Sequence, residues 1–390
     1  MIIPIADQAL VKKINQKLIL NEILNNSPIS RATLSEVTGL NKSTVSSQVN
    51  ELIEKDFIFE IGTGQSRGGR KPVMLVFNKN AGYSIGIDIG VDYINGVMTD
   101  LEGNIILEKS SDFSSSSSSE VKEILLTLIR DFISRMPNCP YGLVGIGICI
   151  PGLINCKQEI ISMPNSEWYI KDLKHLIENE FHVPVFIENE ANAGAYGEKV
   201  FGTTKNYENI IYISINIGIG LGIILDNELY KGVNGFSGEM GHMTIDFNGP
   251  KCSCGNRGCW ELYASEKALL ASFSSVEEKN EKNLVRKEII ERANKNDVDA
   301  LNALQNFGFY ISIGITNILN TFDTQAIILR NNIIESHPIV LNTIKNEVAS
   351  RLHSHLENTC ELLPSSLGKN APALGAVSIV INHFLNVQNE

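Results

Sequence analysis

The stretch GFSGEMGHMTIDFNGPKCSCGNRGCWEL, residues 235–262, is the part of this chain from which the fold can be assigned. Three cysteines lie within eight residues and a histidine precedes them by ten: His242, Cys252, Cys254 and Cys259. Three thiolates and one imidazole make a closed tetrahedral zinc set, which is typical of structural zinc. The alternative is three buried reduced cysteines, which so tight a cluster with two glycines makes less favourable. The stretch therefore predicts a structural Zn²⁺ site.

Two carboxylates flank the predicted metal ligands. Glu239 precedes His242 by three residues, and Glu261 follows Cys259 by two. A metal-bound histidine has a second ring nitrogen, whose tautomer the metal fixes and which needs a partner. Carboxylates that accept from several hydroxyl groups, beside such a nitrogen, suit a polyhydroxylated ligand. From this stretch alone, solvated surface positions for both carboxylates are equally compatible.

The totals describe a globular protein of two or three domains. The chain has 390 residues, 43% of them hydrophobic, which is too long for one ordinary core. The cysteines outside the cluster are scattered, as in reduced cytoplasmic proteins. The N-terminal residues do not resemble a signal peptide, and the longest apolar run, residues 210–225, is too polar to span a bilayer. These features predict a cytoplasmic location and no membrane partner.

Charge is distributed unevenly along the chain. Residues 1–82 carry ten Lys and Arg against seven Asp and Glu, whereas the whole chain has a net charge of −11. A mildly basic N-terminal part joined to an acidic body is typical of a small nucleic-acid-binding module fused to another domain.

The N-terminal part has the pattern of a helix-turn-helix. Apolar spacing predicts helices over 13–24 and 31–37, the second capped by Ser30, and a third that begins after Asn41 and reaches about Lys55. Two helices around a glycine turn, the second with short polar side chains outside, favour reading of base edges in the major groove. Other small three-helix cores look similar. The candidate DNA contacts are Arg31, Lys42, Ser43, Thr44, Ser46, Ser47, Gln48 and Asn50.

A basic wing is predicted to follow these helices. Strands over 57–61 and 73–77 enclose TGQSRGGRKP, a glycine-rich hairpin tip. Its cations Arg67, Arg70 and Lys71 would reach phosphates or a narrow minor groove. The wing at this distance favours a winged helix-turn-helix that binds operator DNA over a generic three-helix core.

The remainder reads as an α/β fold of strands joined first by turns and then by helical crossovers. Buried strands are expected at 83–90, 143–150, 183–188, 210–225 and 326–330, and a helix is expected to begin at about residue 371. The glycine clusters GIGICI and Gly218-x-Gly220-x-Gly222 both lack the spacing of a dinucleotide fingerprint. A Rossmann dehydrogenase is therefore a poor interpretation.

Together, GExGH followed by CxCGxxGCxE, the ENxxN turn at 188–192 and the N-terminal winged helix resemble the ROK family of repressors and sugar kinases over essentially the whole chain. Within that family the sequence looks most like its Gram-positive xylose-repressor branch. The resemblance implies a two-lobed, actin-like and hexokinase-like body. The implied domains are 1–80, a first lobe over 81–197 completed by the helix 371–390, and a second lobe over 198–370 with the zinc site.

The resemblance also implies site residues. In the sugar kinases of the family the ENxxN turn and the metal stretch line the cleft between the lobes. Carried onto this chain, the zinc ligands are His242 and the three clustered cysteines. The implied sugar ligands are Pro151, Gly152, Asn189, Glu190, Glu239, His242 and Glu261.

The kinase pattern fails at four places. The phosphate loop D-x-G-G-T reads Asp88-Ile89-Gly90-Val91-Asp92, where a carboxylate would repel phosphate. The second phosphate turn has Ile217 in place of threonine, and Arg330-Asn331 replaces an adenosine-side Gly-Gly. The catalytic aspartate is Glu190, and a displacement of about 1 Å can cost roughly 100-fold. These departures predict a sensor and no catalysis.

The resemblance therefore implies a dimeric repressor that leaves its operator when a sugar binds the body, and the sugar that the resemblance implies is D-xylose. One alternative is an active sugar kinase with a fused DNA-binding head. Another is a regulator, repressor or activator, that senses a different sugar or a partner protein.

Overall fold

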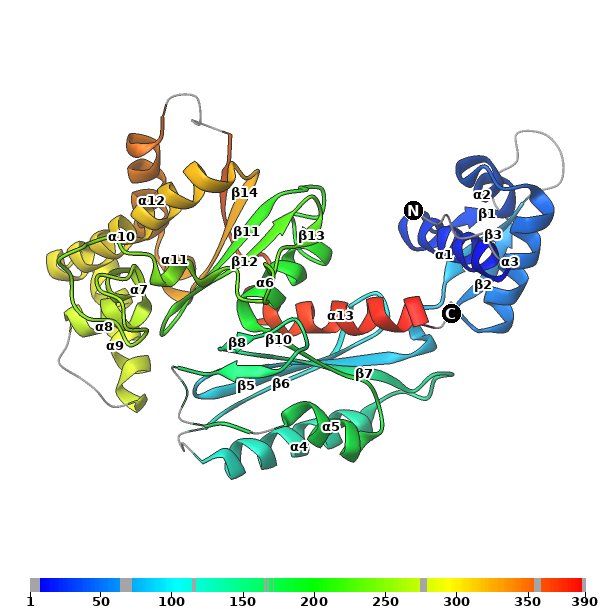
Figure 1. Cartoon of the computed structure of the whole chain (residues 1–390), viewed down its shortest axis with the longest axis horizontal. Coiled ribbons are helices and arrows are strands. Elements are labelled where there is room, and N and C mark those ends of the chain that lie inside the picture. The colour runs from blue at the N-terminus through cyan, green and yellow to red at the C-terminus, as the bar shows by residue number, and fades with distance from the viewer. Residues whose placement is uncertain are drawn as a thin grey trace.

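The computed structural model of this chain describes residues 8–63, 72–113, 117–164, 166, 168–170, 172–273, 279–353 and 359–387. Figure 1 shows an N-terminal domain that stands apart from a body of two lobes. None of the described helices is both long enough and apolar enough to cross a membrane.

The N-terminal domain packs three helices on a small sheet. Ser30 caps α2 by accepting from Thr33 N, and Asn41 Oδ1 caps α3 by accepting from Thr44 N at 2.8 Å, so both predicted caps are confirmed. The strands pair in the order β1-β3-β2. The elements are α1 (Gln8–Asn26), β1 (Ile29–Ser30), α2 (Arg31–Thr38), α3 (Lys42–Glu54), β2 (Ile58–Thr63) and β3 (Val73–Phe77).

The first lobe is a five-stranded sheet in the order β10-β7-β4-β5-β6. Strand β4 pairs antiparallel with β5 but parallel with β7, and β4 is buried along its whole length, as a central strand covered on both faces should be. The strands are β4 (Tyr83–Ile89), β5 (Tyr93–Thr99), β6 (Ile105–Asp112), β7 (Leu143–Ile150) and β10 (Val185–Asn189). Smaller elements are β8 (Leu153–Ile154) and β9 (Ile160–Ser162), and the outer helices are α4 (Ser118–Arg135) and α5 (Leu173–Phe181).

The second lobe repeats this plan, with the sheet order β13-β12-β11-β14-β15. Again an antiparallel meander precedes two parallel strands reached through helices. The strands are β11 (Ile210–Ile215), β12 (Ile219–Leu225), β13 (Glu228–Leu229), β14 (Ala326–Arg330) and β15 (Glu361–Pro364). The helices are η2 (Glu239–His242), α7 (Glu261–Ala264), α8 (Glu266–Phe273), α9 (Lys279–Asn294), α10 (Val298–Phe322), α11 (Asn332–Ser336) and α12 (Pro338–Arg351).

Two helices, α6 (Glu190–Val200) and α13 (Ala371–Val387), lie between the lobes and exchange sheets. Helix α6 follows the first sheet but packs on β11 and β12, while α13 follows the second sheet but packs on β4 and β7. They approach each other so closely that a Cβ on Gly375 would overlap the carbonyl oxygen of Ala193. The division placed at residue 197 from the sequence therefore falls inside α6.

Helix α13 also reaches the N-terminal domain (Figure 1). Phe384 packs on Phe57 and Tyr141, with ring centroids 5.8 and 5.1 Å away, and Phe57 stacks on Tyr141 at 5.3 Å. Tyr141 Oη donates to Lys55 O at 2.7 Å. The core of the N-terminal domain is thus continuous with the faces of the first lobe and α13.

Candidate inter-lobe site, metal site and DNA-binding face

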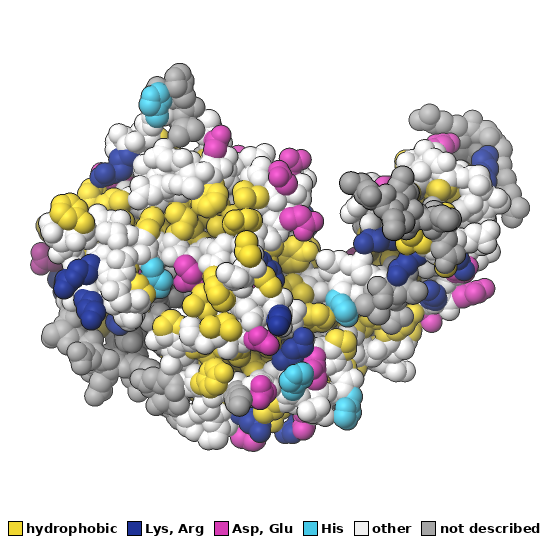
Figure 2. Space-filling model, viewed as in Figure 1, with side chains coloured by type: hydrophobic (Ala, Val, Ile, Leu, Met, Phe, Trp, Pro, Cys, Tyr) yellow, Lys and Arg dark blue, Asp and Glu magenta, His cyan; other side chains and the backbone are white. Residues whose placement is uncertain are grey.

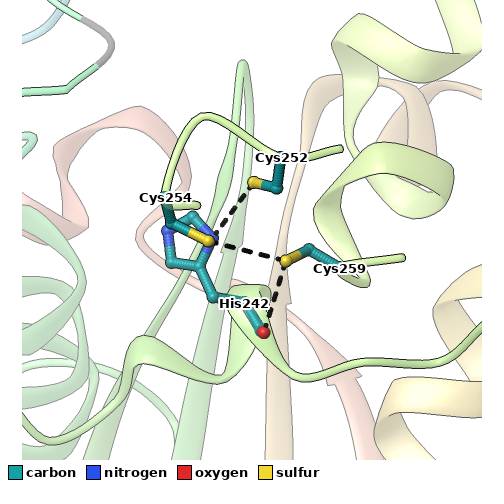
Figure 3. A group of neighbouring side chains, drawn as sticks. All are labelled: His242, Cys252, Cys254 and Cys259. Carbon is teal, nitrogen blue, oxygen red and sulfur yellow. Dashed lines mark hydrogen bonds between the residues drawn. The ribbon is translucent and has the colours of Figure 1, made fainter. Parts of the chain in front are cut away.

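The four predicted metal ligands converge in the second lobe (Figure 3). His242 ends the short helix η2, and the cysteines lie on a hairpin in which Cys252 N donates to Asn256 O at 2.8 Å. Gly258 closes this hairpin with φ of 61°, and a Cβ there would overlap Asp246 O. A glycine is therefore required for the cysteines to face one point.

The spacing of the ligand atoms fits a tetrahedral ion. Cys254 and Cys259 Sγ are 3.7 Å apart, and Cys252 Sγ is 3.6 Å from His242 Nδ1. Zinc bonds of about 2.3 Å to sulfur and 2.0–2.1 Å to nitrogen place neighbouring ligands roughly 3.5–3.8 Å apart. All four ligand atoms lie within 4.8 Å of one another. This His/Cys cluster can hold a metal ion.

The two flanking carboxylates take different positions. Glu239 Oε2 is 3.9 Å from His242 Nε2, the ring nitrogen that faces away from the cysteines. Glu261 Oε1 instead lies 3.3 Å from His242 Nδ1 and 3.2 Å from Cys252 Sγ, on the metal side. Burial raises the pKa of Glu239, an effect that His242 opposes and Glu261 reinforces. Of the two carboxylates, only Glu239 lies beside the nitrogen available to a ligand.

Asn189 and Glu190 lie where β10 runs into α6. Asn189 Oδ1 caps α6 by accepting from Ala191 N at 2.8 Å, and Asn189 Nδ2 donates to Gly152 O at 3.0 Å and to Glu190 Oε2 at 3.1 Å. The loop Pro151-Gly152 thus holds Asn189 in place. Burial and then Asp88 raise the pKa of Glu190 to about 8, with a smaller contribution from Glu239. This shift favours the protonated form of Glu190 at neutral pH. We call Asn189, Glu190, Glu239 and His242 the carboxylate half of the inter-lobe site.

The phosphate-loop side is filled by the chain itself. The ring of Tyr93 lies against Gly90, so closely that a Cβ added at Gly90 would overlap it. Tyr93 Oη donates to Asp88 Oδ2 at 2.8 Å. Arg330, at the end of β14, is 7% exposed. Burial and then Asp88 raise the pKa of Tyr93, and the charge of Arg330 opposes that rise. We call Asp88, Gly90, Tyr93 and Arg330 the arginine half.

The other residues that depart from the kinase pattern have ordinary structural positions. Asn331 caps α11, accepting from Ile333 N at 2.8 Å, and its Nδ2 donates to Ile215 O at 2.7 Å. Ile217 and Asp92 are half-buried.

One contact across the lobes was not predicted. Lys231, after β13, pairs with the buried Glu188 at the end of β10. Nearby, Cys156 Sγ is 3.6 Å from Val233 O. No local pattern joins residues so far apart in the chain, although Glu188 is the first letter of the ENxxN turn. Two surface hollows, one along β6 and α4 and one at the junction with the N-terminal domain, contain none of the predicted site residues.

The candidate DNA-binding face lies on α2 and α3. Lys42, Ser43, Ser47 and Asn50 are exposed, and Thr44 and Ser46 are half-buried. Arg31 donates to Asn50 Oδ1 at 3.0 Å and to Glu60 Oε1 at 2.8 Å, so it is already paired. Figure 2 shows Lys and Arg side chains gathered on this domain. The wing cations Arg67, Arg70 and Lys71 lie outside the described residues.

The structure corrects one of these predictions. Gln48 is 5% exposed, and its Oε1 has no hydrogen-bond partner among the described residues. The reason is helical spacing, because Gln48 shares the inward stripe of Val45, Val49 and Leu52. In this structure Gln48 cannot contact base edges.

Comparison with known proteins agrees with this architecture. The ROK family profile matches residues 84–383, and a winged helix-turn-helix DNA-binding profile matches residues 13–58. The chain is 68% identical to the xylose repressor of Bacillus spizizenii over 383 residues, 98% of this chain and 99% of that protein. It is 67% identical to the xylose repressor of Bacillus subtilis, with the same coverage.

Solved structures give the same result. A ROK family transcriptional regulator, a homolog of the E. coli MLC protein, superposes with a TM-score of 0.79 at 26% identity, covering 97% of this chain and 98% of that one. A ROK family glucokinase from Streptomyces griseus, in complex with glucose and AMPPNP, has a TM-score of 0.67 at 26% identity and covers 76% of this chain and 98% of its own. The regulator thus matches both domains and the kinase the body alone. This chain belongs to the ROK family and carries an N-terminal winged helix-turn-helix DNA-binding domain.

Proposed function

We propose that this protein is a cytoplasmic transcriptional repressor that binds operator DNA through its winged helix-turn-helix and is released when D-xylose binds the inter-lobe site. The observation that carries this proposal is the 68% identity, over nearly the full length of both chains, to the xylose repressor of Bacillus spizizenii. The exposed polar residues of α3 supply the groups that base edges and phosphates require.

The proposed sugar ligands are the groups of the carboxylate half. Glu190, protonated at neutral pH, can donate one hydrogen bond and accept others, and Glu239 can accept from hydroxyl groups. His242 Nε2 can bind a hydroxyl while Nδ1 faces the metal set. Pro151-Gly152 and Asn189 hold the shape of the site, and Glu261 supports His242 from the metal side.

We further propose that the metal is Zn²⁺ and that its role is structural. The donor set is closed, with three thiols and one imidazole, so it leaves no position for a reacting water. The residues fit the ion in number, type and spacing. Bound zinc would hold η2 and the cysteine hairpin together, and would thereby fix the ring of His242.

The arginine half favours a regulator over a kinase. Tyr93 and Arg330 occupy the side of the site where the ROK kinase pattern requires a phosphate loop open to nucleotide. Incubation with ATP and xylose or glucose should give no phosphorylated sugar, because a nucleotide would have to displace the partly buried Tyr93 and the buried Arg330.

Coupling of the sugar to DNA is proposed to pass through α13. This helix packs against α6, whose first turn holds Glu190, and its Phe384 contacts Phe57 of the DNA-binding domain. In a homodimer two such domains would occupy two operator half-sites. Coupling free energies of this kind are about 1–3 kcal/mol, or roughly 5–150-fold in affinity.

The test is operator binding by fluorescence anisotropy, with and without sugar. D-xylose should weaken operator binding at least about fivefold, and D-glucose should do so less. Phe384→Ala should leave xylose affinity close to wild type while reducing the sugar-dependent change, and the exposed Phe247→Ala should behave as wild type. Operator affinity that is the same with and without every sugar tested would refute the proposal. If another sugar weakens operator binding and xylose does not, that sugar is the effector in place of xylose.

A further inference from the structure

The ion pair between Lys231 and Glu188 joins the two lobes, and the proposed function gives it no role. Glu188 lies on β10, an edge strand of the first-lobe sheet, and Lys231 follows β13, an edge strand of the second-lobe sheet. Lys231 Nζ donates a hydrogen bond to Glu188 Oε2. The glutamate is buried and the lysine is partly exposed. This pair therefore connects the lobes directly, in addition to the helices α6 and α13.

Backbone contacts accompany the ion pair. Residues 231–238 run from the end of β13 to the beginning of η2, and we call them the linking segment. A Cβ added at Gly235 would overlap Ile154 O and Cys156 N, so the linking segment lies against the chain that follows β8 in the first lobe. Cys156 Sγ is 3.6 Å from Val233 O. The lobes thus meet along the linking segment, and the ion pair lies at its first residue.

The carboxylate of Glu188 has partners on both lobes. Its Oε1 accepts from Asn189 N at 3.1 Å and from Asn192 Nδ2 at 3.2 Å, both within the ENxxN turn of the first lobe. Its Oε2 accepts from Lys231 of the second lobe. One buried side chain therefore orients the ENxxN turn and also fixes the distance from that turn to the linking segment.

The residues of the carboxylate half directly follow the two partners of this contact. Asn189 and Glu190 come immediately after Glu188 in the first lobe. Glu239 and His242 belong to η2, which begins where the linking segment ends. A separation of the linking segment from the first lobe would therefore move one pair of proposed ligand groups away from the other.

We propose that the Lys231–Glu188 ion pair, together with the linking segment, holds the carboxylate half assembled for its ligand. Lys231 is then a positioning residue, which acts through Glu188 and the linking segment. This inference rests on the proposed function in that the ligand is taken to be a sugar. The pair matters more than an ion pair on the surface, because a buried carboxylate that loses its cation keeps the cost of its burial.

The experiment compares Lys231→Met, which removes the charge, with Lys231→Arg, which keeps it, with Glu188→Gln and with the double variant Lys231→Met/Glu188→Gln. Lys109→Met is the matched control, because Lys109 pairs with Asp131 at 3.3 Å within the first lobe. Calorimetry measures D-xylose affinity, and fluorescence anisotropy measures operator release as xylose is added. Amide hydrogen exchange reports the linking segment, in which Ser237 N donates to Lys231 O at 3.1 Å. Thermal melting identifies any variant that does not fold.

Lys231→Met should weaken xylose binding about tenfold or more, because the buried carboxylate of Glu188 loses its cation. Hydrogen exchange in the linking segment should become faster. Operator binding without sugar should stay close to wild type, and release should need proportionally more xylose while reaching the same final level. A loss of stability alone would not shift the release curve in this way. Lys231→Arg should restore most of the affinity, and Lys109→Met should change none of these quantities.

The double variant tests whether the two side chains act together. Residues that act through one contact have effects that do not add in free energy. Lys231→Met/Glu188→Gln should therefore weaken xylose binding by no more than about threefold beyond Lys231→Met alone. If the factors measured for the two single variants multiply in the double variant, the two side chains act independently and the proposal is wrong.

A folded Lys231→Met protein with wild-type xylose affinity would also overturn the proposal. If Lys231→Met does not fold, the double variant, which has no unpaired carboxylate at this place, is measured instead, and wild-type affinity there has the same meaning. If the wild-type protein itself binds no xylose, the proposed effector is wrong. Hydrogen exchange then decides the role of the ion pair, and equal exchange of the linking segment in wild type and Lys231→Met would refute it.

Discussion

The two halves of the inter-lobe site differ in the hydrogen-bond partners of their polar side chains. In the arginine half, the Tyr93 hydroxyl donates to Asp88, and Asp88 and Arg330 are buried while Tyr93 is partly buried. In the carboxylate half, Glu239 is exposed and His242 is partly buried, and their nearest side-chain atoms are 3.9 Å apart, too long for a hydrogen bond. The first half contains this internal hydrogen bond, whereas the Glu239 side chain has no hydrogen-bond partner among the described residues.

Under the proposed function, this difference would allow a shared fold to lose nucleotide binding and keep a sugar site. The backbone of the loop at Asp88–Asp92 is present, but the ring of Tyr93 lies against Gly90. The metal set, in contrast, brings four ligand atoms together, and Asn189 of the ENxxN turn caps α6 and donates to Gly152 O. Occupying a site with side chains removes its ligand without altering the sheet that supports it.

The largest effect is expected from a substitution in the metal set, which should disrupt the carboxylate half and leave the arginine half unchanged. Cys259→Ser removes a buried metal ligand, so bound zinc should fall from about one per chain to near zero, and the second lobe should lose at least about 4 kcal/mol of stability. Xylose binding should be lost as well, because His242 would no longer be fixed. Metal analysis, thermal melting and calorimetry provide the measurements.

The matched control is Cys360→Ser, a half-buried cysteine outside the metal set. It should keep its zinc and its sugar affinity. Full xylose affinity in zinc-free Cys259→Ser would show that the metal set and the ligand groups are independent.

The next effect concerns the support that both halves share. Gly375→Val places a side chain where the backbone of α6 at Ala193 already lies, so α6 must move away from α13. Overpacking of this kind costs about 3 kcal/mol. Because α6 begins at Glu190, sugar affinity and operator affinity should fall together. Gly62→Ala, which meets nothing within 4 Å, should leave both unchanged. If only one of the two affinities changes in Gly375→Val, α6 and α13 do not act as one unit.

The smallest effect concerns Glu190, a residue of the carboxylate half whose pKa is raised by Asp88 of the arginine half. Glu190 keeps its proton in the folded state up to about pH 8, whereas the unfolded chain releases it near pH 4.5. The unfolded chain binds fewer protons between these values, so Glu190 makes stability fall as pH rises through that window. Glu190→Gln should remove about 2–3 kcal/mol of this decrease between pH 5 and 7. Chemical denaturation of both proteins at several pH values measures the difference, and parallel pH profiles would contradict the assignment.

Local patterns predicted the parts of this molecule that depend on neighbours in sequence. The caps Ser30 and Asn41, the beginning of α13 at Ala371 and the metal set all follow from spacing of a few residues. Helical period would also have placed Gln48 on the inner face, had its position relative to Val45 and Val49 been weighed above its polarity.

Contacts between distant segments could not be obtained in this way. Arg330-Asn331 was identified as a departure from the Gly-Gly of the kinase pattern, but its spacing could not indicate an effect on Tyr93, 237 positions earlier in the chain. Glu261 was expected to face a ligand, and its position beside Cys252 depends on how α7 enters after the hairpin. The pair Lys231–Glu188 likewise exists only once the lobes are together.

The packing of Phe384 on Phe57 has a consequence for biosynthesis. During translation the N-terminal DNA-binding domain emerges from the ribosome first, and its own helices can form early. The domain can pack against α13 only after that helix, more than three hundred residues downstream of Phe57, has been synthesised. We therefore expect nascent chains to carry a DNA-binding domain that folds before its position relative to the body is fixed.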